Sequence, residues 1–212
     1  MEWVTGIFSH VCGQGRCFLV GGAALPVCQR CLGLYVGALL TAAWIVAGGV
    51  RGRGLPSWSV FAVDTAALAA AMLGGLHVVE GGPVWRMTCG LWTGHVAMLW
   101  LAGAAAQLAA RRNPSKDTPP WRLREKLGGA ALVAAMPLVA GSFGRLAALG
   151  WWFWTAAALA GLVVVWLAAA WSLIEALLWA LAYVSRGRSL AGSNSRISAR
   201  ASTSVESTTG RP

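Results

Sequence analysis

The stretch LGLYVGALLTAAWIVAGGV, residues 32–50, contains no charged side chain and runs into the basic sequence Arg51-Gly52-Arg53. A helix needs about 20 mostly apolar residues to cross the hydrocarbon core of a membrane, so this stretch has the length and the boundary of one span. We therefore expect an all-α fold, a polytopic transmembrane helix bundle of about five spans. The four further apolar stretches are 58–79, 87–110, 127–144 and 146–184. The stretch 127–144 contains Pro137. The stretch 146–184 is too long for one upright helix, although no residue marks a turn within it.

The composition of the 212-residue chain agrees with a membrane protein. Hydrophobic residues make up 57% of it and charged residues 11%, whereas soluble domains carry about 25% charged residues. A soluble enzyme is therefore excluded as the default, and 5 cysteines are too few for a secreted disulfide scaffold. The stretch 185–212 is rich in Ser, Thr, Arg and Gly, and we expect it to be a disordered basic tail. The chain thus divides into an extracytoplasmic cysteine-rich segment (1–31), the helical bundle (32–184) and this tail.

The distribution of Lys and Arg predicts the orientation of the bundle. With five spans, one face holds 13 basic residues, in the first loop, the third loop and the tail, and the other face holds 4. With six spans the tail would change sides and the counts would be 8 and 9. Lys and Arg accumulate on the cytoplasmic side, so we expect five spans with the N-terminus outside. The net charge of +10 then reflects this rule and attraction to the lipid bilayer rather than nucleic-acid binding.

Four of the 5 cysteines lie close together before the first span. Their spacing is Cys12-x4-Cys17-x10-Cys28-x2-Cys31, and His10 stands two residues before the first of them. Zinc sites are built from such pairs of thiolates, with a longer turn between the pairs, and a Gly-Gly dipeptide provides that turn. The spacing predicts a metal site for zinc or iron, in which the four cysteines are ligands and His10 is an alternative ligand.

Two other interpretations of these cysteines remain open. Pro26 suits the start of a helix, which would place Cys28 and Cys31 near the first turn. A helix N-terminus and the adjacent Arg30 favour a thiolate, as a thiol–disulfide oxidoreductase in the manner of DsbB-like or vitamin-K-reductase-like proteins would need. Outside the cytoplasm the cysteines could equally form structural disulfides, and the bundle would then be a non-catalytic membrane subunit. Whether the protein is an enzyme stays open.

One pattern connects the cysteines with the start of the first span. It consists of His10, Cys12, Gln14, Phe18, Pro26, Cys28, Arg30, Cys31, Gly33, Tyr35 and Gly37. This pattern resembles the domain-of-unknown-function 2085 family of small prokaryotic membrane proteins, and the resemblance extends more weakly to Asp64 and the stretch 86–94. It implies a multi-pass protein of the cell membrane, the prokaryotic inner membrane, and it implies no activity. A histidine usual in the family is replaced by Gly13, so His10 or Cys17 would have to substitute for it as a ligand.

Asp64 stands out among the polar residues of the predicted spans. It lies six residues into the second span, where an ionised carboxylate costs about 2.5–3.5 kcal/mol on insertion scales. Such residues usually face a cavity, a partner or an ion path. The alternative is that the helix begins at Asp64, which then serves as its N-cap. Further candidate functional residues collect at the outer boundary, where an interfacial ion pair or a hydrogen bond to a carbonyl would also explain them: Arg30, His77, Arg86 and Cys89.

Two small-residue motifs predict close packing of helices. Gly33-x3-Gly37 lies in the first span and Gly90-x3-Gly94 in the third. Glycines at this spacing let two backbones approach closely, so we expect the first and third spans to cross beneath the cysteines. The same glycine faces are candidates for contact with a protein partner.

Overall fold

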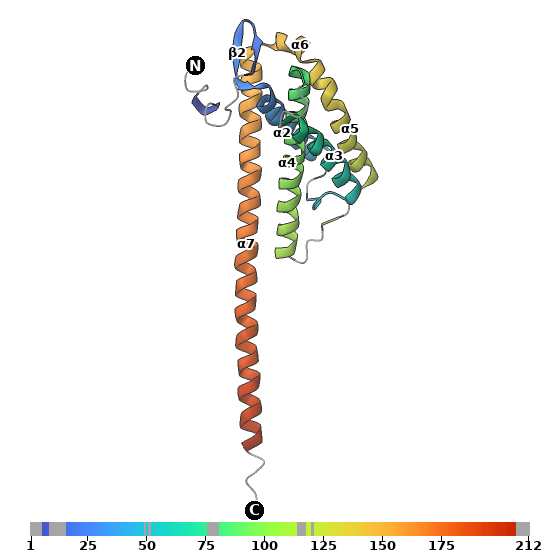
Figure 1. Cartoon of the computed structure of the whole chain (residues 1–212). Helices are drawn as coiled ribbons and strands as arrows, with labels where there is room; N and C mark the ends of the chain where they lie inside the picture. The colour runs from blue at the N-terminus through green and yellow to red at the C-terminus, as the bar shows by residue number, and fades with distance from the viewer. Residues whose placement is uncertain are drawn as a thin grey trace, which may run out of the picture.

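Helices form most of the described chain (Figure 1). The computed structural model describes residues 6–8, 16–48, 50, 52–75, 81–113, 118–119 and 121–206. After a short helical segment at residues 6–8 come two strands, β1 (Cys17–Val20) and β2 (Ala23–Cys28). The helices that follow are α2 (Gln29–Ala47), α3 (Trp58–Gly75), α4 (Pro83–Arg112), α5 (Leu123–Gly141), α6 (Phe143–Leu146), the 3-10 helix η1 (Ala147–Leu149) and α7 (Trp151–Glu206). The all-α fold class is confirmed, with one small two-stranded sheet added to it.

β1 and β2 form an antiparallel hairpin, whose turn lies at the expected Gly-Gly dipeptide, although the two strands themselves are not expected from the sequence. Gly21 and Gly22 connect the strands with φ angles of 61° and 82°. A two-residue hairpin turn of type I′ requires positive φ at both central residues, and glycine adopts positive φ without strain. Pro26 therefore lies in β2 and not in the first turn of a helix, and α2 begins at Gln29. The hairpin lies at the same end of the bundle as α6 and the start of α7, which we call the hairpin end (Figure 1).

α2 and α4 cross where the two glycine motifs meet. A Cβ atom at Gly33 would collide with the carbonyl oxygen of Met87, and one at Gly94 would collide with that of Leu34. The two backbones therefore pack directly, and the expected crossing of the first and third spans is confirmed. These glycine faces pack against each other within the chain, and contact with a protein partner stays a prediction. The glycines that contact the opposite backbone are Gly33, Gly37, Gly90 and Gly94.

Not every predicted span is long enough to cross a membrane by itself. Among the described residues, α2, α4 and the Trp151–Val184 part of α7 have the necessary length and apolar character. α5 passes the same test only together with Phe143–Leu149, and the two are bent by 64° at a short break. The apolar part of α3, Trp58–Leu73, is shorter. The described helices amount to 3 spans, or 4 if the bent pair is one span, and the count of five stays a prediction.

Pro137 lies inside α5 without ending the helix. Proline has no N–H, so the carbonyl of Val133, four residues earlier, loses its helical donor. The indole Nε1 of Trp92, on α4, donates to that carbonyl at 3.0 Å. A neighbouring helix thus supplies the missing hydrogen bond, which is the condition under which membrane helices tolerate proline.

α7 is one continuous helix from Trp151, so the last apolar run contains no turn after Gly150, whereas its first residues, 146–149, belong to α6 and η1. It runs beside α4 and extends well beyond it (Figure 1). The sequence predicts a disordered tail from residue 185, whereas α7 continues to Glu206. No proline occurs from 151 to 206, so no proline breaks α7 within these residues, although the Ser, Thr and Gly of its last part favour helix less than Ala or Leu.

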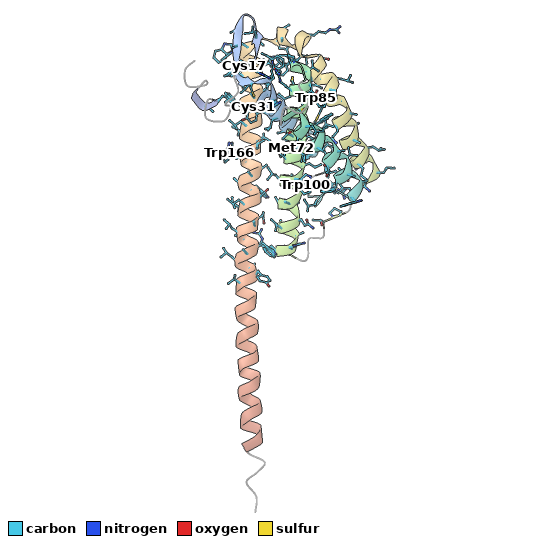
Figure 2. The ribbon with its side chains drawn as sticks, in the orientation of Figure 1. Cys17, Cys31, Met72, Trp85, Trp100 and Trp166 are labelled. Carbon is cyan, nitrogen blue, oxygen red and sulfur yellow. The ribbon has the colours of Figure 1, made fainter. Side chains whose placement is uncertain are left out.

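The exposed side chains on the upper part of α7 are mostly large and apolar. Trp166, Leu167 and Trp171 are 67%, 64% and 61% exposed, and Figure 2 shows Trp166 directed away from the other helices. A contiguous apolar face of this kind is rare on soluble proteins. The face is therefore suited to contact with the lipid bilayer.

Candidate functional site

Asp64 lies within α3 and is only 1% exposed. Because α3 begins at Trp58, the alternative that Asp64 is the N-cap of this helix is wrong. Oδ1 of Asp64 lies 3.5 Å from Nε2 of His95 on α4, and the His95 side chain is 0% exposed. The carboxyl group of α3 therefore faces an ionisable ring on the neighbouring helix, in the interior of the bundle.

The other ring nitrogen of His95 contacts Thr41 on α2. Nδ1 of His95 lies 2.9 Å from the hydroxyl oxygen of Thr41, which donates its hydrogen to the carbonyl of Gly37 at 2.7 Å. A hydroxyl group has a single hydrogen, so the contact with His95 requires an N–H at Nδ1 as donor. Three helices each contribute one side chain to this arrangement, Asp64, His95 and Thr41, which we call the buried polar cluster.

The buried polar cluster contains hydrogen-bonding atoms that no described residue satisfies. Oδ2 of Asp64 and Nε2 of His95 are buried and make no hydrogen bond with the described part of the chain. The distance of 3.5 Å between the two side chains exceeds that of an ordinary N–H···O bond. The ring of Trp44 lies beside the imidazole, with 6.5 Å between the ring centroids. The same indole lines a cleft of about 480 Å³ formed by Trp44, Ala47, Gly48, Arg124 and Glu125.

His95 is a site residue that the sequence analysis above does not select. One signal could have found it: Asp64 and His95 are the only Asp, Glu, Lys, Arg or His residues in the stretches 58–75 and 87–110. Two such residues in adjacent apolar segments are expected to pair, because an ionisable side chain in the membrane interior usually has a partner. The composition supplies this signal without showing which faces of the two helices meet.

Cys17 and Cys28 are opposite each other in the hairpin. The N–H of Gln29 donates to the carbonyl of Arg16 at 3.0 Å, so the neighbouring pair is hydrogen-bonded and the cysteine pair is of the non-hydrogen-bonded type. In such pairs the Cα atoms are about 4.5 Å apart and the side chains share one face. This spacing is within the range that a disulfide can bridge, although no disulfide joins the described cysteines to one another.

Cys28 is also the N-cap of α2. Its Sγ accepts the backbone N–H of Cys31 at 3.4 Å, the hydrogen bond typical of a capping side chain. A sulfur at a helix N-terminus is held more readily as a thiolate, the form that binds metals and exchanges disulfides. Cys17 and Cys31 both lie at the hairpin end (Figure 2). The expected position of Cys28 and Cys31 near the first turn is therefore confirmed.

The described residues do not make a complete metal site by themselves. Within the part of the chain that the structure describes, no group of 3 or more His, Cys, Asp or Glu side chains is placed to hold one ion. Cys12 and His10, which belong to the predicted ligand set, lie outside the described residues. The structure thus brings Cys17, Cys28 and Cys31 to one end of the bundle without closing them around a single point.

Three of the candidate residues expected at the outer boundary, Arg30, Arg86 and Cys89, lie near the crossing of α2 and α4. Nη1 of Arg86 donates to Oε1 of Gln29 at 3.4 Å, which connects the starts of the two helices. Cys89 is buried on α4, and the carbonyl of Arg30 contacts α4 in the same region. His77 lies outside the described residues.

Two ion pairs join elements far from the hairpin. Nη2 of Arg53 lies 2.8 Å from Oε1 of Glu125, and these side chains are 9% and 1% exposed. Glu125 also accepts the backbone N–H of Arg122 at 2.8 Å, which caps the start of α5. In the second ion pair, Nη1 of Arg112 at the end of α4 lies 3.5 Å from Oε2 of Glu175 on α7. The sequence identifies these arginines only as part of the charge bias, because their partners are distant along the chain.

Comparison with known proteins supports the membrane assignment. The family model described as "Predicted membrane protein (DUF2085)" matches residues 12–105. The matched part contains all of the buried polar cluster, the helix crossing and the cysteines from Cys12 onward. No curated protein and no solved structure matches the chain.

Proposed function

We propose that this integral membrane protein, whose residues 12–105 match the DUF2085 family model, binds a zinc or iron ion in its cysteine-rich segment, outside the cytoplasm. The position of Cys28 is the observation that carries the proposal. Cys28 lies opposite Cys17 in the hairpin, and its sulfur caps the helix that carries Cys31. Local structure therefore gathers three of the proposed ligands at one end of the bundle.

The chemistry of these sulfurs fits a thiophilic cation. Zinc takes four ligands in its structural sites, commonly thiolates and imidazoles, and iron also binds to sets of cysteine thiolates. Cys17, Cys28 and Cys31 supply three donors in the proposed site, and Cys12 or His10 supplies the fourth. Their convergence on the ion would accompany binding, because metal binding and the ordering of a small segment are coupled. The bound ion would then tie the hairpin to the start of α2.

Elemental analysis of the purified full chain, together with a count of free thiols, tests this proposal. We expect about one zinc or iron ion per chain, as a closed four-ligand site requires. Cys28→Ser and Cys31→Ser should each abolish most of the bound metal. Cys89→Ser is the matched control, because Cys89 is buried on α4 and should leave the metal content unchanged. A folded chain that contains no metal, even after purification with zinc or iron present, would contradict the proposal.

Disulfide exchange is a second candidate function, favoured by the pairing of Cys17 with Cys28. Their non-hydrogen-bonded position is compatible with a disulfide. In the exchange, the two thiols lose two protons and two electrons as their S–S bond forms, and the disulfide of a protein substrate takes them up as it breaks into two thiols. Cys17 is only partly buried, whereas Cys28 is buried, so Cys17 would attack the substrate disulfide and Cys28 would then resolve the mixed disulfide.

Thiol trapping with an alkylating reagent, followed by mass spectrometry, separates the two functions. Incubation with an oxidised disulfide-containing peptide should produce a Cys17–Cys28 disulfide and a reduced peptide in equal amounts. Cys28→Ser should stop the reaction at a mixed disulfide on Cys17, and Cys89→Ser should react like the unmodified protein. Unchanged thiols at both positions would eliminate the exchange function without affecting the metal proposal.

A further inference from the structure

The buried polar cluster places two electron-pair donors against each other. Thr41 uses its hydrogen on Gly37, so Nδ1 of His95 carries the hydrogen that Thr41 accepts. Nε2 of the neutral ring then has only a lone pair, and it faces Oδ1 of Asp64 at 3.5 Å. An ionised carboxylate also offers lone pairs only. The contact between Nε2 and Oδ1 is unfavourable when neither atom carries a hydrogen, and it becomes a hydrogen bond when one proton binds between them.

We propose that Asp64 and His95 form a proton-binding site in the interior of the bundle, with one proton held between Oδ1 and Nε2. The proton produces an imidazolium beside a carboxylate, or a neutral acid beside a neutral imidazole. In both forms the cluster has no net charge and no repulsive contact. Because the two side chains are 2% and 0% exposed, water cannot compensate an unpaired charge there. The bundle therefore gains a hydrogen bond between α3 and α4 when the site is occupied.

The surrounding helices do not offer a competing proton site close to the cluster. Asp64 is the only ionisable residue of α3. On α4 the nearest is Cys89, six residues from His95, which is about 9 Å along the helix axis. Glu125 and Glu175 have arginine partners of their own. The ionisable residues on the helices around the cluster, besides Asp64 and His95, are Arg30, Cys31 and Tyr35 on α2, Arg86, Cys89, Arg111 and Arg112 on α4, Arg124, Glu125 and Lys126 on α5, and Glu175, Tyr183, Arg186, Arg188, Arg196, Arg200 and Glu206 on α7.

The test uses the full chain in lipid or detergent, with ¹⁵N-labelled histidine. The chain has 3 histidines, so the double variant His10→Gln/His77→Gln leaves His95 as the only labelled ring. Its ¹⁵N chemical shifts report which nitrogen carries hydrogen, and the infrared spectrum reports a protonated carboxyl group. The pH is varied from about 4 to about 9, which includes the ordinary range of both groups. We expect hydrogen on Nδ1 at every pH, and a second proton at Nε2 or on the carboxyl group at the acidic end.

Three substitutions connect the signal to the cluster. Asp64→Asn retains the shape of the side chain and should remove the carboxylic acid band and shift the Nε2 resonance. Thr41→Val removes the acceptor of the Nδ1 hydrogen, so the hydrogen should divide between the two ring nitrogens. Glu175→Gln is the matched control, because Glu175 is a buried carboxyl group on another pair of helices, and it should change neither signal.

Two results would overturn the proposal. One is a neutral His95 beside an ionised Asp64 over the whole pH range, since the site would then take up no proton. The other is a neutral ring with its hydrogen on Nε2. Both are measured on the chain with an intact cluster, so the proposal stays testable even if Asp64→Asn does not fold.

Discussion

Among the described residues, each buried carboxyl group lies beside an arginine or histidine side chain. The pairs are Asp64 with His95, Arg53 with Glu125, and Arg112 with Glu175. A pair of this kind adds little to stability compared with apolar residues of similar size, but the loss of one member is costly because the other charge stays buried. The cost therefore depends on how deeply both members are buried.

The Arg53–Glu125 pair allows this dependence to be measured. Glu125→Gln should lower the free energy of unfolding by about 3–5 kcal/mol, because both side chains are nearly inaccessible to solvent. Glu175→Gln should cost clearly less, since its partner Arg112 is 38% exposed and can be hydrated. Denaturant titration of the purified chain in mixed micelles measures both values. The double variant Arg53→Met/Glu125→Leu should recover much of the loss, and equal losses for Glu125→Gln and Glu175→Gln would contradict the reasoning.

At the scale of secondary-structure elements, α5 depends on α4 for one backbone hydrogen bond. Trp92 donates to the Val133 carbonyl, which has no helical donor because of Pro137. Trp92→Phe should lower the free energy of unfolding by about 1–3 kcal/mol, the cost of leaving a buried carbonyl unsatisfied. In a Pro137→Ala background the cost should be smaller, because the restored backbone N–H at position 137 bonds to the same carbonyl.

Trp151→Phe, measured in the same two backgrounds, is the control for this prediction. Trp151 on α7 also donates its indole N–H to a backbone carbonyl, that of Ala24 in the hairpin, at 2.9 Å. Trp151→Phe should therefore destabilise the chain by the same amount with or without Pro137→Ala. Equal effects of Trp92→Phe in the two backgrounds would show that Trp92 does not compensate for the proline.

At the scale of the whole molecule, the charge bias and the fold predict the same orientation of the protein in the membrane. Arg16, Arg30 and Arg145 belong to elements at the hairpin end, whereas Arg112 and the start of α5 belong to the other end (Figure 1). Because Lys and Arg accumulate in the cytoplasm, reporter fusions after Arg53 and after Arg112 should be cytoplasmic, and a fusion near Arg145 should be outside. A reporter at the C-terminus that is found outside the cell would contradict both the five-span count and this orientation.

Several features of the protein follow from the sequence by itself. The apolar stretches, the cysteine spacing and the position of Cys28 at the start of α2 depend on residues close together in the chain. The crossing of α2 and α4 also follows, because glycines at a spacing of four mark the face along which two helices can approach. Asp64 is recognisable because a carboxyl group in an apolar span is costly.

Only the tertiary structure decided which residues meet across the bundle. Thr41 and His95 are 54 residues apart, Trp92 and Val133 are 41 apart, and Arg53 and Glu125 are 72 apart. A helix that is apolar all round has no periodic pattern to show which face meets a neighbour. The bend between α5 and α6 also depends on packing. The partner of Asp64 was therefore fixed by the way α2, α3 and α4 pack, and the sequence alone could show only that a partner was needed.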